Sequence, residues 1–93
     1  MVRTTLALKR AVDALNVAVS EFNASGGSDG SRVLAAVFEL NNEIGRLFRS
    51  AADSRLRELQ LDVNEVTKAA KRLDGDKLAR AMEKVRERSL QLP

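Results

Sequence analysis

Four basic side chains in the second half of the chain have the spacing to bind phosphate groups. They project away from the apolar stripe of their predicted helix and are Arg57, Lys68, Lys71 and Arg72. Between residues 55 and 93 the chain holds ten basic and seven acidic residues, so the net charge of +3 belongs to this part. A cationic face of this kind can neutralise the phosphates of nucleic acid. One interpretation of the chain is therefore a basic helical nucleic-acid-binding module.

A second interpretation of the same charges is an ordinary solvated helix surface. Acidic residues are interspersed among the basic ones, and spacings of four residues favour ion pairs such as Asp53 with Arg57 and Asp76 with Arg80. The only aromatic residues are Phe22, Phe38 and Phe48, which lie on apolar faces and are not expected to stack on bases. The sequence therefore favours binding to protein over binding to nucleic acid.

The glycine-rich stretch at residues 23–32, NASGGSDGSR, resembles a phosphate-binding loop only in composition. Such a loop follows a strand and ends in Gly-Lys-Ser or Gly-Lys-Thr, whereas here a predicted helix precedes and Gly30 is followed by Ser31. Gly26 and Gly27 suit the left-handed conformation that ends a helix, and Ser31 suits a helix N-cap. The stretch is predicted to be a turn between two helices.

Catalysis has little support in the residue types present. The chain has no cysteine and no histidine, which removes thiolate chemistry, the commonest general base and the commonest transition-metal ligands. No pair of carboxylates is distinguished by surroundings that would separate their pKa values. We expect no enzymatic activity, no catalytic residue, no metal site and no cofactor.

The length and the hydropathy pattern indicate one helical domain over residues 1–93. No apolar run approaches the roughly 18 residues that cross a bilayer, so no membrane span is expected. The first 16 residues lack an uninterrupted apolar core and a cleavage pattern, which predicts a cytoplasmic location.

Apolar periodicity predicts an all-α fold, an antiparallel helical bundle. A first helix runs from Thr4 to Phe22, and a third follows Gly75, which is expected to end the preceding helix while Asp76 caps the next. Between them, residues 32–73 carry one apolar stripe without proline. The stripe comprises Leu34, Phe38, Asn41, Gly45, Phe48, Ala52, Leu56, Leu59, Val63, Val66, Ala70 and Leu73.

The continuous phase of this stripe favours one long helix and a short-long-short bundle of three. Four helices result if the segment breaks near 52–62, where Asp53 offers a cap and residues 62–65 match a capping box. The upstream half carries a second apolar row, which an unbroken helix would leave uncovered. Its central residues are Val37, Leu40, Ile44 and Leu47. We therefore expect these four residues to form the interface of a homodimer, or to bind another helical protein.

Overall fold

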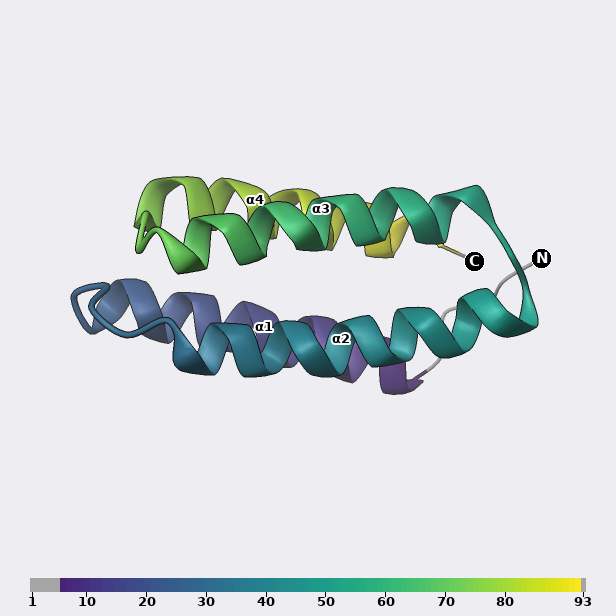
Figure 1. Ribbon diagram of the computed structural model, residues 1–93, viewed down its shortest axis with the longest axis horizontal. Coiled ribbons are helices and arrows are strands. Elements are labelled where there is room, and N and C mark those ends of the chain that lie inside the picture. Colours follow the sequence, from purple (N-terminus) through teal and green to yellow (C-terminus); the bar gives the residue numbers. More distant parts are fainter. Residues whose placement is uncertain (1–5, 93) are drawn as a thin grey trace.

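The structure is a computed structural model that describes residues 6–92 and folds them as four antiparallel helices (Figure 1). The helices are α1 (Leu6–Ala24), α2 (Ser31–Ser50), α3 (Ser54–Lys71) and α4 (Gly75–Leu90). No strand occurs within residues 6–92, which confirms the predicted all-α bundle. The expected start of the first helix at Thr4 lies outside the described residues.

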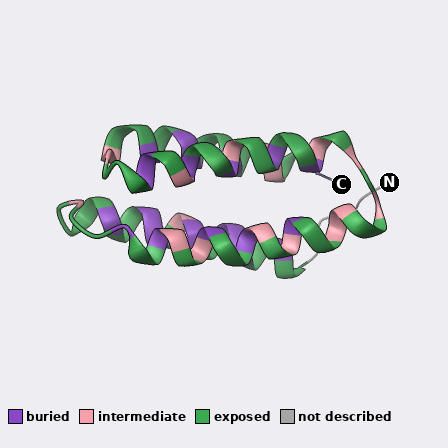
Figure 2. Ribbon diagram, viewed as in Figure 1, coloured by how far each residue is buried: buried purple, intermediate pink, exposed green. Residues whose placement is uncertain are grey.

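Each helix packs against its neighbours in sequence, and α4 closes the bundle against α1. The bundle is long and narrow, with principal extents of 40 × 18 × 18 Å. The four helices run for 16 to 20 residues each, so all four cover nearly the whole length of the core. Figure 2 shows by colour that buried residues recur along all four helices.

Residues 32–73 form two helices, so the preference for one continuous helix is wrong. Ala51 is extended, with φ −152° and ψ 97°, and Asp53 is the N-cap of α3. The chain reverses over these three residues, and α3 packs back along α2. At residues 62–65, the other possible break, α3 continues without interruption. Folding back buries the apolar residues of both halves, whereas a single helix of about 60 Å would expose one row.

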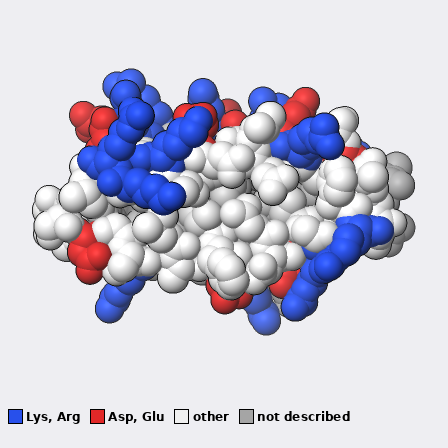
Figure 3. Space-filling model, in the orientation of Figure 1, with Lys and Arg blue, Asp and Glu red and all other residues white. Residues whose placement is uncertain are grey.

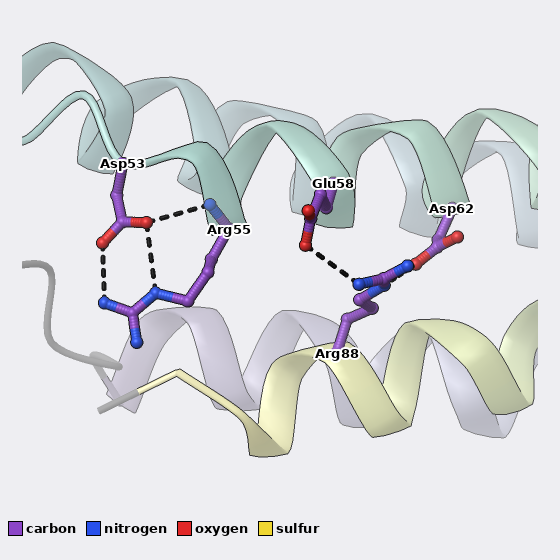
Figure 4. A network of polar contacts seen from close by, with 5 residues as sticks. All are labelled: Asp53, Arg55, Glu58, Asp62 and Arg88. Carbon is purple, nitrogen blue, oxygen red and sulfur yellow. Dashed lines mark hydrogen bonds and ion pairs between the residues drawn. The ribbon is translucent and has the colours of Figure 1, made fainter.

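Asp53 holds the start of α3 through its carboxylate. One oxygen, Oδ1, accepts hydrogen bonds from the backbone N–H of Arg55 at 2.9 Å and from its Nε at 3.1 Å. The other, Oδ2, accepts from the guanidinium at 2.7 Å (Figure 4). The bonds from the Arg55 side chain and then from its backbone lower the pKa of Asp53 from 3.8 to about 2.

The turn between α3 and α4 uses a leucine where the sequence predicted a glycine. Leu73 has a φ of 55°, and its N–H bonds to the carbonyl of Ala70 while the next N–H bonds to that of Ala69. This is the two-bond pattern of a Schellman motif. Gly75 is instead the first residue of α4, and Asp74 rather than Asp76 is the N-cap.

The turn between α1 and α2 agrees better with its prediction. Gly26 and Gly27 have positive φ values of 97° and 70°, as expected at a helix end. Ser31 does not cap α2. It begins the helix, and its N–H donates to Oδ1 of Asp29 at 3.0 Å.

We predict that Leu73→Gly raises the free energy of unfolding by about 1 kcal/mol, because the left-handed conformation is strained for leucine and not for glycine. Urea denaturation measures the change. Leu73→Ala is the control, since it removes the same side chain and keeps the strain. A gain in stability for the alanine variant equal to that of the glycine variant would exclude backbone strain as the cause.

The lowered pKa of Asp53 predicts a pH-dependent contribution to stability. Since the pKa in the fold lies below that of the unfolded chain, the ionised carboxylate stabilises the fold above about pH 4, and this stabilisation is lost as the pH falls from about 4 to about 2. Asp53→Asn keeps an N-capping side chain but removes the charge. Its thermal midpoint should lie below that of the parent at pH 6, and the difference should shrink as the pH falls toward 2. A difference that does not change over this range would contradict the assignment.

Candidate functional site

Of the four residues predicted to form a dimer interface, three lie inside the bundle and the fourth lies at the edge of its core. Val37, Leu40 and Ile44 expose 4%, 0% and 2% of their surface, and Leu47 is partly buried against the same core. The predicted interface position is therefore wrong. The break at residues 51–53 lets this row of α2 face the core, so its neighbours are helices of the same chain.

The other apolar row of α2 lies at the surface instead. Phe38 is 64% exposed, and Leu34 and Phe48 are only partly buried at the edge of the core. Spacings of three and four residues place the row on one side of the helix. It comprises Leu34, Phe38, Asn41, Gly45 and Phe48, and we call it the α2 surface row. The described residues cover this row only in part, because Leu34 and Phe48 pack against the edge of the core while Phe38 and Gly45 are exposed.

The contact between Arg57 of α3 and Phe48 of α2 shows where the α2 surface row lies relative to α3. The guanidinium carbon of Arg57 lies 6.0 Å from the centre of the Phe48 ring, so the row runs beside α3. Around this side of the bundle, the middle of the surface is almost free of charged side chains (Figure 3). Arg57 therefore covers an aromatic ring near the α2–α3 turn and does not join the other residues predicted to bind phosphate.

Gly45 is notable because nothing among the described residues requires a glycine there. It lies in the interior of α2 without a positive φ, and a Cβ added to it would meet no atom within 4 Å. Glycine costs about 1 kcal/mol relative to alanine in a helix interior. The α2 surface row thus has a small gap at Gly45 and a projecting ring at Phe38, two helical turns away.

Two of the predicted phosphate-binding residues, Lys68 and Arg72, meet three cations of α4 around one groove of about 250 Å³. The alanines Ala69 and Ala81, which are 5% and 7% exposed, also line it. The full lining, here called the α3–α4 groove, is Glu65, Lys68, Ala69, Arg72, Lys77, Arg80, Ala81 and Lys84. Figure 3 shows basic side chains gathered over this end of the bundle. Lys71 is exposed on α3 but does not line the groove.

Few of these cations are neutralised. Lys68 contacts Glu65 at 3.3 Å, and this is the one ion pair within the groove among residues 6–92. Arg72, Lys77, Arg80 and Lys84 form no ion pair in the described part of the chain. The expected pair of Asp76 with Arg80 is not formed.

Further along the same two helices the charges are paired. Arg88 of α4 donates from Nε to Asp62 and from its terminal nitrogen to Glu58, both at 2.9 Å (Figure 4). These contacts join α3 to α4 and neutralise that half of their shared surface. The groove cations without an ion pair therefore lie nearer the α3–α4 turn than Arg88 does.

The sequence contained partial signals for both surfaces. Lys77, Arg80 and Lys84 were recognisable as outward-facing, but that they share a groove with Lys68 and Arg72 depends on the α3–α4 turn. For the α2 surface row, the useful signal was Gly45, since a glycine in a helix interior needs an explanation outside the helix itself.

The described residues show no group of three or more acidic, histidine or cysteine side chains placed to hold a metal ion. Within that same part of the chain, none of the helices is both long enough and apolar enough to cross a membrane. Comparison of the chain with protein-family models, with curated proteins and with solved structures finds no match.

The reassignment of the four predicted interface residues to the core has a direct test. Leu40→Ala should lower the free energy of unfolding by about 2–5 kcal/mol, because a fully buried leucine leaves a cavity. Chemical denaturation at a low, fixed protein concentration measures the loss without a contribution from association. A loss below about 0.5 kcal/mol would show that Leu40 lies on the surface of the single chain.

Proposed function

We propose that this protein is a protein-association module that forms a homodimer through the α2 surface row. The observation that carries the proposal is the pairing on one face of a projecting Phe38 with an open site at Gly45. A two-fold interface uses the same patch on both subunits, so that patch must be complementary to itself. A knob and a hole on one row satisfy this condition.

The spacing supports an antiparallel arrangement of the two α2 helices. With the symmetry axis near Asn41 and Asn42, Phe38 of each subunit meets the partner's Gly45. The glycine allows the two backbones to approach closely. The ring then leaves water, which is worth roughly 1.5–3 kcal/mol for a fully buried aromatic side chain.

The charged residues Glu39 and Arg46, which lie beside the α2 surface row, fit the same two-fold arrangement. Glu39 and Arg46 each follow a member of the pair by one residue, so the arrangement brings Glu39 beside the partner's Arg46. In the single chain Glu39 forms no ion pair with another described residue, and Arg46 contacts Glu43 at 3.4 Å with its own side chain 70% exposed. Opposite charges at matching positions favour this register over a parallel one.

The side of the bundle that carries the α2 surface row is also large enough for a stable dimer interface. A bundle of 40 × 18 Å offers a side comparable to the roughly 800 Å² that one partner contributes to a standard interface. The uncharged middle of that side reduces the cost of removing it from water.

Gly45→Gln separates dimerisation from folding. Glutamine has a higher helix propensity than glycine, and its Cβ would meet no described atom within 4 Å, so the monomer should be more stable by roughly 0.5–1 kcal/mol. The same side chain fills the site for Phe38 and should weaken the dimer at least 10-fold. Sedimentation equilibrium gives the association constant, and thermal denaturation at low concentration gives the stability.

Two further sets of variants test which residues form the interface. Phe38→Glu should also dissociate the dimer, whereas Val17→Glu, at a residue of α1 that is 54% exposed, should leave it intact. Glu39→Arg and Arg46→Glu should each weaken association, and the double exchange should restore it. A parent protein that stays monomeric at high micromolar concentration, or a dimer insensitive to Gly45→Gln, would refute the proposal.

A further inference from the structure

The α3–α4 groove combines a concave shape with uncompensated charge. Five cations and one carboxylate line it, which leaves a formal charge of +4. The cations come from two helices that the Schellman turn at Leu73 sets side by side. The small alanines between them keep the middle of the groove open.

We infer that this groove binds the phosphodiester backbone of nucleic acid without reading its base sequence. Lys77, Arg80 and Lys84 form a line along α4 that spans seven residues, or about 10 Å. Measured along the axis of duplex DNA, one strand has a phosphate every 3.4 Å, so about three phosphates of one strand fall within that length. Lys68 and Arg72 line the groove from α3, so cations of both helices face the same stretch of backbone.

The residue types of the groove determine what it recognises. No aromatic side chain lines it, so stacking on unpaired bases is not available, and no asparagine or glutamine is present to read the edge of adenine. A membrane surface is the less favoured ligand, because the side chains between the cations are alanines that expose less than 10% and offer no large apolar group for insertion. The site lies on α3 and α4 and does not depend on dimerisation through α2.

The test compares two variants that lose the same charge. Arg80→Gln with Lys84→Gln removes two groove cations, and Lys9→Gln with Arg10→Gln removes two exposed cations from α1. Fluorescence anisotropy of a labelled 20-base-pair DNA duplex measures binding between 50 and 200 mM KCl. For the parent we expect micromolar affinity at 50 mM and a slope of log K against log salt of about −3, from roughly 0.9 per phosphate contact.

The groove variant should have a slope near −1 and bind roughly 100-fold more weakly at 50 mM salt. The α1 variant should keep most of the parent's affinity and slope. A second duplex of unrelated sequence should bind within about threefold of the first. Circular dichroism should be equal for all three proteins, since all four substituted residues are exposed.

Three results would overturn the inference. Equal losses in the two variants would show that only net charge matters. Displacement of the duplex by 5 mM inorganic phosphate, compared with chloride at the same ionic strength, would show a site for free phosphate. Loss of binding to phosphatidylserine vesicles in the groove variant, with duplex binding equal in all three proteins, would assign the groove to a membrane surface.

Discussion

The rest of the structure depends on one constraint, which is that α2 carries two apolar rows and only one of them can face the bundle core. The reversal at Ala51–Asp53 settles which row it is. Asp53 caps α3 and binds Arg55, and α3 returns along α2 so that Leu40 and Ile44 become buried. Phe38 and Gly45 are left on the outside as a consequence of the same reversal. The proposed dimer rests on this exposed aromatic ring and interior glycine, which share one face of α2.

The second surface follows from the distribution of charge between α3 and α4. At one end of their contact, Arg88 is neutralised by Glu58 and Asp62, and these bonds hold the two helices together. Nearer the α3–α4 turn, four cations form no ion pair within residues 6–92, namely Arg72, Lys77, Arg80 and Lys84. Along the contact between α3 and α4, the cation that joins the two helices is thus separated from the cations that have no ion pair. The α2 surface row and the α3–α4 groove lie on different helices, so a dimer through α2 would present two grooves on one assembly.

Much of the fold could be predicted from the sequence, because helix periodicity and the absence of strand patterns are local properties. The break at residues 51–53 was harder, because the stripe from Leu34 to Val66 keeps its phase across it. A usable signal existed: the second row ends at Ala51, and Glu58 and Asp62 occupy the positions that would continue it. Whether the four predicted interface residues are buried or exposed could not be derived before the topology was known. The groove also required the turn at Leu73, where a strained leucine replaces the expected glycine.

The reversal of the chain at residues 51–53 is tested most directly by measuring the distance between the far ends of α2 and α3. Because the chain lacks cysteine, Ala35→Cys with Lys68→Cys allows two spin labels to be attached at exposed positions of the two helices. Pulsed electron paramagnetic resonance, on labelled protein diluted with unlabelled protein, then gives the distance between the two labels within one molecule. The folded-back arrangement predicts about 20 Å or less, since packed helices lie 8–10 Å apart. A separation of about 50 Å, the length of 33 residues of unbroken helix, would contradict the reversal and with it the exposed row of α2.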